Sequence, residues 1–342
     1  MSEDALKLTT YFGERARVKG RLLADELLDA HARHDIRLSV LLRGIQGFGA
    51  KHHLRTDRLL TLSEDLPLVS IAIDERERIE ALRREVAALP GEGLVTVERA
   101  RLTDSLGGLS AESELKLTVC LGRHERIDGE PAFRAVCRVL REAGVSGATV
   151  LLGVDGTIGG KRRRARFFAR NGGVPLLVLS VGEAVRMDRA LAALKQMSPS
   201  LLCTLERARV CKRDGQLLRP PVHDALALDG GSAWWKLTVV TSEAARHQAA
   251  PVYLELVRRL REHGAAGATS LRGIWGFHGE HPPHGDRLLS LRRHVPVVTE
   301  TIDTPERIRV LFGIVDELTS ERGLVTSELV PSSAPLGRSP GL

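Results

Sequence analysis

One pattern constrains the fold of this chain more than any other: a glycine-rich sequence that follows an apolar run occurs three times. It reads GIQGFG at Gly44–Gly49 and GIWGF at Gly273–Phe277, with a weaker copy at Gly153–Gly160. Copies separated by about a hundred residues or more are typical of tandem domains, since the repeats of solenoid proteins are much shorter. The sequence therefore predicts three copies of one small domain.

The three copies also share their first and last strands. The first strand reads LKLT at Leu6–Thr9 and Leu115–Thr118 and WKLT at Trp235–Thr238, and the last strands are expected at Leu94–Val97, Leu201–Thr204 and Leu324–Thr326. A third strand begins at a proline in each copy, which is one of the few places where a sheet tolerates proline. These prolines are Pro67, Pro175 and Pro296.

Between these strands, apolar residues with a period near 3.6 predict two helices in each copy. Clear examples are Phe133, Val136, Cys137 and Leu140 in the second copy, and Ile308, Leu311, Val315 and Leu318 in the third. The resulting order is β-α-β-β-α-β, which is typical of the ferredoxin-like fold, an α+β fold with a four-stranded antiparallel sheet.

We expect domains at 1–103, 112–211 and 233–331, of which the second is degenerate. Polar or Pro/Gly-rich stretches predict linkers at Thr103–Glu114 and Cys211–Ala233, and a disordered tail at 332–342.

The composition indicates a soluble globular protein. The chain has 342 residues, of which 43% are hydrophobic, and its start is polar and acidic, unlike a signal peptide. We therefore expect a cytoplasmic location. The four cysteines form no C-x-x-C pair, which predicts reduced thiols that act as small hydrophobic residues. A net charge of +7 favours anionic partners in general.

At this point the chain resembles a known family. The combination of Gly47-Phe48-Gly49 before a long loop with Gly91-Glu92-Gly93 before the last strand is similar to the PII signalling proteins. It more closely resembles their PII-like relatives, known as domain of unknown function 190. Phrases such as Leu62–Pro67 and Gly93–Arg99 carry this resemblance. It covers nearly all of the first copy and much of the third.

The resemblance implies that ATP or ADP is bound in clefts between neighbouring units. The base of the long loop and the glycine turn before the last strand would then face the phosphates, with nearby cations completing the site. Glycines suit this role independently of any family, because they let successive backbone N–H groups point at one anion. The candidate ligand-binding residues are Gly47, Phe48, Gly49, Lys51, Gly91, Gly93, Arg99 and Arg101, with Gly276 and Phe277 in the third copy and Lys161, Arg207 and Arg209 in the second.

The chain departs from the PII pattern at several of these positions. Ala50-Lys51 stands where PII proteins have Arg-Gln, and Leu94 stands in place of a phosphate-binding lysine. The glycine turn has become Ser198-Pro199-Ser200 in the second copy, and only Gly323 remains in the third. We therefore expect neither 2-oxoglutarate sensing nor three equal sites, and we predict no bound cofactor other than a nucleotide ligand.

PII proteins form trimers, and three copies in one chain suggest that the trimer closes within a single polypeptide. In a fused chain the units do not lose the entropy of association between separate molecules. They lose only the smaller entropy of loop closure. We expect a monomer with internal pseudo-three-fold symmetry.

Three other features have alternative interpretations. The basic run at Lys161–Arg166 suits either a solvated loop or an acidic partner. Prolines separate His278, His281 and His284, which argues against placing them on one helix face, so we expect no metal site. Trp234-Trp235 is more typical of packing than of a ligand platform.

The sequence thus predicts a non-catalytic regulatory protein that binds a small anion and signals through its long loops. Its target could be a membrane channel or another protein, and the channel is suggested by the resemblance alone. One alternative is an RNA- or protein-binding module, although aromatics for base stacking are scarce at 4%, and we do not expect nucleic acid as a partner. Another is an enzyme that hydrolyses phosphate esters or nucleotides on the same fold, although no Ser-His-Asp set and no complete P-loop occurs in the sequence.

Overall fold

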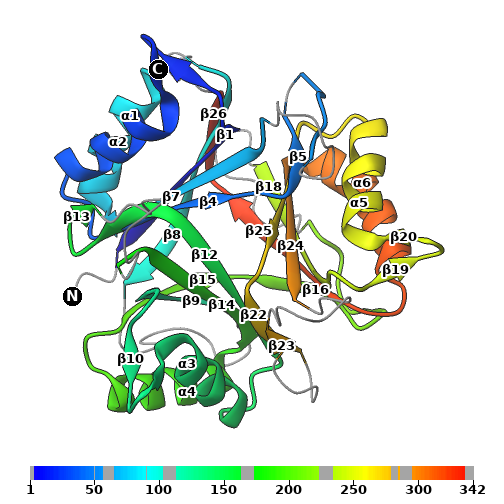
Figure 1. The fold of residues 1–342 in the computed structure, drawn as a ribbon. Coiled ribbons are helices and arrows are strands. Elements are labelled where there is room, and N and C mark those ends of the chain that lie inside the picture. The colour runs from blue at the N-terminus through cyan, green and yellow to red at the C-terminus, as the bar shows by residue number, and fades with distance from the viewer. Residues whose placement is uncertain are drawn as a thin grey trace.

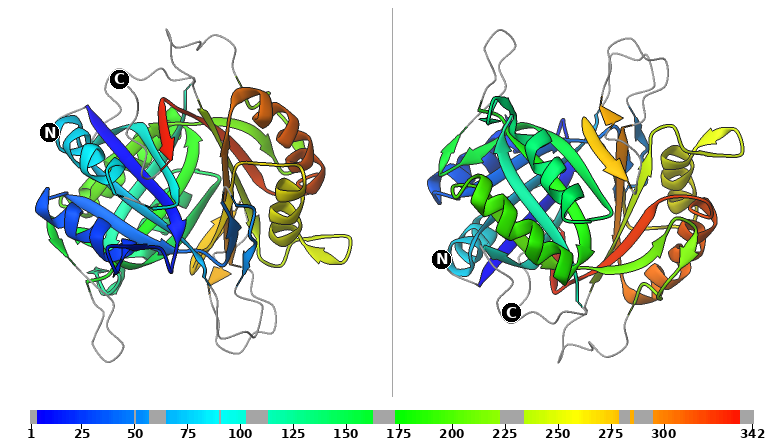
Figure 2. Two further views of the ribbon diagram at one scale, coloured as in Figure 1. Left: turned by 90° about the horizontal axis from the view of Figure 1, so that it is seen from above. Right: turned by 90° about the horizontal axis from the view of Figure 1, so that it is seen from below.

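The fold consists of three helix pairs on the outside of the molecule with the strands gathered between them (Figure 1). A computed structural model describes residues 4–49, 51–56, 65–89, 91–102, 113–162, 173–222, 234–278, 284–285 and 295–335. Views from above and below show the same arrangement, with each helix pair covering the outer face of its own strands (Figure 2).

Each of the three units contains four long strands and two helices in the predicted order. The first unit has β1 (Ala5–Gly13), α1 (Leu23–Arg33), β4 (Leu38–Arg43), β7 (Pro67–Glu75), α2 (Arg76–Ala87) and β8 (Gly93–Leu102). The second has β9 (Glu114–Gly122), α3 (Ala132–Glu142), β12 (Gly147–Ile158), β14 (Pro175–Glu183), α4 (Ala184–Met197) and β15 (Leu202–Arg207). The third has β18 (Trp234–Ser242), α5 (Val252–Glu262), β21 (Ala268–Arg272), β24 (Pro296–Asp303), α6 (Pro305–Leu318) and β25 (Leu324–Val330).

The strands of each unit pair in the same antiparallel order. The orders are β8-β1-β7-β4, β15-β9-β14-β12 and β25-β18-β24-β21. A short hairpin that the sequence analysis did not predict precedes the first helix of each unit. These hairpins are β2 (Arg17–Val18) with β3 (Arg21–Leu22), β10 (Arg126–Ile127) with β11 (Glu130–Pro131), and β19 (Arg246–His247) with β20 (Ala250–Pro251).

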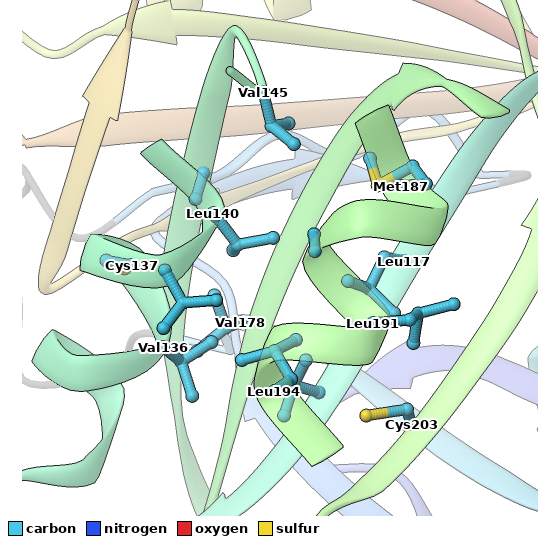
Figure 3. Close-up of a cluster of buried hydrophobic side chains, with 14 of the residues drawn as sticks. Leu117, Val136, Cys137, Leu140, Val145, Val178, Met187, Leu191, Leu194 and Cys203 are labelled. Carbon is cyan, nitrogen blue, oxygen red and sulfur yellow. The ribbon is translucent and has the colours of Figure 1, made fainter. Parts of the chain in front are cut away.

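The helices pack as their apolar spacing predicts. In the second unit Val136, Cys137 and Leu140 of α3 meet Leu191 and Leu194 of α4 over the strands (Figure 3). The four cysteines are free and buried, as predicted, and burial raises the pKa of the Cys137 thiol to about 12. Trp235 is packed in the core of the third unit, which confirms a packing role for that residue.

The glycine-rich stretches leave the sheets of their own units. Each one pairs with a strand of a neighbouring unit. Strand β5 (Gln46–Phe48) of the first unit pairs with β21 of the third, and β22 (Trp275–His278) of the third unit pairs with β12 of the second. The second half of β12 in turn pairs with β4 of the first unit. The three strand exchanges therefore run in one cyclic direction. Each crossing segment continues into a short hairpin partner, namely β6 (Arg55–Thr56), β23 (His284–Gly285) and β13 (Lys161–Arg162).

The closing strands make a second set of exchanges in the opposite direction. The end of β8 pairs with β15, β16 (Arg209–Arg213) pairs with β25, and β26 (Ser332–Pro335) pairs with β8. Two predictions are therefore wrong in part. The expected linker from Cys211 begins instead with the end of β16 and with β17 (Gln216–Leu217), and the expected disordered tail contains β26 up to Pro335. Residues 336–342 lie outside the described residues.

Sequence analysis missed these segments because their partners lie in another unit. Strand pairing is formed by backbone groups, so a short polar segment can become a strand wherever a sheet edge is presented to it. Among the residues that the structure describes, none of the helices is both long enough and apolar enough to cross a membrane.

Candidate functional site

Six charged side chains form a closed ring where the three units meet. Each lysine of the repeated LKLT or WKLT strand bridges the glutamate of its own closing strand and the glutamate of another unit. Within units, Nζ and Oε2 are 2.9 Å apart for Lys7–Glu98, 3.1 Å for Lys116–Glu206 and 3.0 Å for Lys236–Glu328. Between units, Lys7 contacts Glu206, Lys116 contacts Glu328, and Lys236 contacts Glu98. Lysines and glutamates thus alternate around the ring.

The ring is buried, and its charges stabilise one another. Lys236 is only 1% exposed and Glu98 only 3%. Burial favours the uncharged carboxyl, but the lysines outweigh it and hold the pKa of Glu328 at about 2 and that of Glu98 well below its usual range. Burial likewise opposes the charge of Lys116 and Lys236, and the carboxylates raise both pKa values above their usual range. Removal of one partner would leave a buried charge without compensation.

The three glutamates alone could suggest a metal centre. One carboxylate oxygen from each of Glu98, Glu206 and Glu328 lies within 4.8 Å of the others. However, an ammonium group lies between each pair of these carboxylates. A divalent cation at this point would be repelled by three positive charges at contact distance. The ring therefore fits a set of ion pairs that joins the units, and it does not fit a divalent metal site.

The predicted loop-base glycines lie at the strand exchanges, where close packing accounts for them. A Cβ atom on Gly47 would lie 2.5 Å from the carbonyl oxygen of Ala268, and one on Gly276 would lie 2.5 Å from that of Ala148. Gly156 is similarly crowded by the carbonyl oxygen of Ser39. A side chain would prevent each crossing strand from approaching its neighbour.

The phenylalanines that follow Gly47 and Gly276 are buried in the core of a neighbouring unit. Phe48 of the first unit is 4% exposed and belongs to the core of the third unit. Phe277 of the third unit is 5% exposed and belongs to the core of the second. Thr157 stands at the corresponding place in the second unit, where it donates to the Ile36 carbonyl at 2.9 Å. These three residues lock one unit onto the next.

An ion pair brings the base of the first loop and the first glycine turn together. Lys51 forms an ion pair with Glu92, which lies between Gly91 and Gly93, and both charged side chains are about two-thirds exposed. A Cβ atom placed on Gly49 would meet no other atom within 4 Å, so the segment is open there. Here the exposed cation, the loop and the glycine turn share one surface.

The predicted arginines, in contrast, lie away from that turn. Arg99 follows Gly93 by six residues along the continuous strand β8, a separation of about 20 Å. Arg99 is exposed, and Arg101 pairs across to Leu205 of the second unit. The glycine turn and these two arginines of the first unit therefore cannot contact the same small anion.

The corresponding residues of the second unit are also directed elsewhere. Arg207 is exposed at the end of β15, whereas Arg209 begins β16 in the sheet of the third unit and donates to the carbonyl of Pro220 at 2.9 Å. Lys161 begins β13, and its side chain is outside the described part of the structure. The strand break at Ala208 separates the two arginines, although strand alternation would have placed them on one face.

Each place where a crossing strand joins the sheet of another unit is a junction between two units. The three junctions differ in the residue directly before the crowded glycine. In the second unit Asp155 is bound by Arg162, which also reaches Asp25 and Asp29 of α1 at 3.1 and 2.6 Å. In the third unit Trp275 lies under Arg134 of α3, with the guanidinium carbon 4.5 Å from the ring centroid.

The first unit has Gln46 at this position. Its Oε1 is buried without a hydrogen-bond partner in the described part of the chain. Two junctions thus have strong contacts of the side chain at this position, whereas Gln46 at the junction of the first unit with the third makes none through Oε1 among the described residues.

The fold and the junctions together define a class: three α+β units of one topology joined by strand exchange and a central ion-pair ring. The family model of DUF190, described as an uncharacterized ACR, matches residues 5–102, 114–210 and 234–332. These matches cover most of the chain, which therefore belongs to the DUF190 family and contains three copies of its domain.

Two comparisons place the chain among known proteins. It is 34% identical over 93 residues to a UPF0166 protein of Aquifex aeolicus (strain VF5), an alignment that covers 27% of this chain and 86% of that protein. A crystal structure of an unknown protein from Galdieria sulphuraria is matched over 64% of this chain and 98% of that one, with 9% identity and a TM-score of 0.20. A score this low carries no argument about the fold.

Sequence analysis did not predict the ring. Its lysines lie in the repeated first strand, and Glu98 and Glu206 directly precede the candidate residues Arg99 and Arg207, but no ion pair between them was expected. A signal was present: a lysine flanked by apolar residues in a central strand faces the protein interior and needs a carboxylate there.

Proposed function

We propose that the protein is a non-catalytic regulatory protein of the PII-like kind, whose three ferredoxin-like units close as an intramolecular pseudo-trimer. The ring of six alternating charges supports this proposal, since the relation between Lys7 and Glu206 recurs twice more around the ring. Both sets of strand exchanges are also cyclic, each passing once around the three units, in opposite directions. Light scattering should then give a mass near 37.3 kDa, and a mass near three times that value would contradict a monomer.

The proposed ligand is a small anion, with adenine nucleotides as the first candidates, bound where the first loop meets the first glycine turn. The observation that carries this proposal is the exposed ion pair of Lys51 with Glu92. An exposed pair contributes little stability, so an anion can take the place of the carboxylate at small cost. Backbone N–H groups of a glycine turn favour an anion at the same place.

Binding at this place could act on a partner through the loops. Lys51 follows β5 by three residues, and β5 is a strand in the sheet of the third unit. A ligand that changes the position of Lys51 would therefore act on the base of the long loop and on the junction with the third unit. A protein partner that contacts the loop, including a membrane channel, would detect this change.

The RNA-recognition alternative has less support. That mode of binding stacks bases on the exposed face of a sheet. In this protein the outer faces are covered by helices, and the inner faces hold the charged ring and an apolar cluster shared by all three units, including Val69, Leu177 and Val298.

The test compares the melting temperature of the wild type and of Lys51→Ala with ATP, ADP, cyclic AMP and bicarbonate. We expect at least one ligand to raise the melting temperature of the wild type and to lose most of this effect in Lys51→Ala. The control is Arg189→Ala, which removes one exposed positive charge from α4 and should respond as the wild type does. Absence of any shift in the wild type, or an equal shift in Lys51→Ala, would contradict the proposed site.

A further inference from the structure

Above the charged ring, the next side chains on the inner faces form a layer of threonines. In each unit the first and last strands place two threonines opposite one another. The pairs are Thr9 with Thr96, Thr118 with Thr204, and Thr238 with Thr326. Side chains two residues apart along a strand share a face, so this layer is one step from the lysines and glutamates. Hydroxyl oxygens from all three units therefore face the centre at one level.

Several of these hydroxyl groups lack partners. Within the described residues, Oγ1 of Thr9, Thr204 and Thr238 is buried and makes no hydrogen bond, and the same holds for Oε1 of Glu328 in the ring beside the layer. Thr9 is 2% exposed and Thr204 is 0% exposed. Buried polar atoms are nearly always paired, so a group of unpaired oxygens at one place indicates a ligand or ordered solvent.

The third strand of each unit adds one side chain to this layer, and here the units differ. Ile71 lies opposite Thr9, and Leu179 lies opposite Thr118, whereas Glu300 lies opposite Thr238. Oε2 of Glu300 accepts a hydrogen bond of 2.9 Å from the hydroxyl of Tyr11, which belongs to the first unit. The third unit thus contributes a carboxylate where the other two contribute apolar side chains.

Glu300 makes the layer negative. The three lysines and three glutamates of the ring cancel, and Glu300 is a fourth carboxylate beside them. Lys236 lies close enough for Glu300 to help raise its pKa, but that lysine already binds both Glu98 and Glu328. Glu300 itself has no cation within 4.0 Å among the described residues. The centre therefore has an excess of one negative charge.

Space is present at this level. Ile71, Leu179, Thr238 and Glu300 are all partly exposed although they lie on inner faces, and so are Tyr11 and Val240 in the next layer. Packing therefore does not bury the side chains of this layer completely. We propose that the threonine layer binds a small monovalent cation at Glu300, with threonine hydroxyl oxygens as further ligands.

The chemistry selects this class of ligand. Carboxylate and hydroxyl oxygens are hard donors that suit alkali cations and ammonium, and one positive charge neutralises the excess. A divalent cation would leave a net positive charge in a buried site, and an anion would add to the negative charge. The site is separate from the junction at Lys51, so failure of the anion proposal would leave it standing.

The first test is cation-selective stabilisation. The melting temperature is measured in chloride salts of K⁺, NH₄⁺, Na⁺ and Mg²⁺ and in N-methylglucamine chloride, all at one ionic strength. We expect at least one small monovalent cation to raise the melting temperature above that in N-methylglucamine chloride, and the rise should saturate with concentration. Equal melting temperatures in all monovalent salts, or a larger rise with Mg²⁺, would overturn the proposal.

Three variants locate the effect. Glu300→Gln keeps the shape and an acceptor for Tyr11 but removes the charge, and it should abolish the selective rise. Thr238→Val removes a hydroxyl while keeping the shape, and it should reduce the rise even if Glu300→Gln fails to fold. Glu77→Gln neutralises an exposed carboxylate of α2 and should behave as the wild type. A full selective rise in both Glu300→Gln and Thr238→Val would overturn the proposal.

A crystal soaked in Rb⁺ provides an independent readout. We expect an anomalous peak within the threonine layer beside the carboxylate of Glu300. A crystal with Rb⁺ elsewhere and no peak in this layer would contradict the site.

Discussion

The centre of the molecule and its outer junctions are under different physical constraints. The ring uses the same two residue types in all three units, and each lysine makes the same two contacts. The junctions are built by the same strand exchange, yet their equivalent positions hold Gln46, Asp155 and Trp275. Removal of one partner of a buried ion pair costs several kcal/mol, because it leaves the other charge uncompensated. The junction positions belong to no such shared ring, so each unit carries its own side chain there.

This difference separates positions that are the same in all three units from positions that differ among them. The ring at the centre joins the units. Replacement of one of its charged residues alone would leave the partner charge buried and uncompensated. The junctions keep the backbone of the exchange, which requires Gly47, Gly156 and Gly276, and they differ in the side chains that line it. Units that began as copies could therefore diverge at the junctions, where Asp155 and Trp275 each contact an arginine and Oε1 of Gln46 has no partner in the described part of the chain.

The comparison is tested most strongly at the ring. Lys236→Met should lower the free energy of unfolding by about 3–5 kcal/mol, because two buried carboxylates lose a partner. The measurement is urea denaturation at neutral pH. The matched control is Lys51→Met, which breaks an exposed pair and should cost about 1 kcal/mol or less. Equal losses in the two variants would mean that centre and surface do not differ in this way.

A smaller effect is expected at the strand exchange. Gly47→Ala places a Cβ 2.5 Å from the carbonyl oxygen of Ala268 and should cost about 1–3 kcal/mol, since β5 must move away from β21. Gly49→Ala, two residues further on, meets no atom within 4 Å and serves as the control in the same denaturation experiment. If the two variants are equally stable, close packing does not explain the glycine of this motif.

The pH dependence of stability also separates the two regions. Burial lowers the pKa of His31, on α1 near Arg162, from 6.5 to about 3. The unfolded chain then binds the proton first, so stability falls as the pH drops from about 6.5 towards 3, by at most about 1.4 kcal/mol per pH unit. Glu328, whose pKa is lowered from 4.5 to about 2, loses its contribution only below about pH 4.5.

The urea midpoint of the wild type should therefore begin to fall near pH 6.5 and fall more steeply below pH 4.5. His31→Leu should remove the slope between pH 6.5 and 4.5 and retain the steeper loss. His53→Leu, which removes an exposed imidazole of the same unit, should leave the curve unchanged. A wild-type slope that persists in His31→Leu would assign the titration to another group.

The elements of the fold were largely predictable from local patterns. Apolar spacing placed Leu311 and Val315 on the buried face of α6, and Pro296 marked the start of β24. The terminal strand β26 and the strand β16 were not predictable in this way, because their partners β8 and β25 belong to other units. The same limitation applied to Arg209 of the candidate site, which contacts the third unit. The separation of Arg99 from Gly93, in contrast, follows from their places on one strand.

The sequence by itself determined the number of units, the order of their elements and the residues that face each core, because periodicity and turn residues act over a few neighbouring positions. Only the tertiary structure decided which unit each glycine-rich strand joins and which glutamate each lysine meets. Backbone hydrogen bonds form with any strand edge of suitable shape, and charge pairing does not depend on distance along the chain. The glycine-rich stretch that reveals the repeat is thus also the segment that joins one unit to the next.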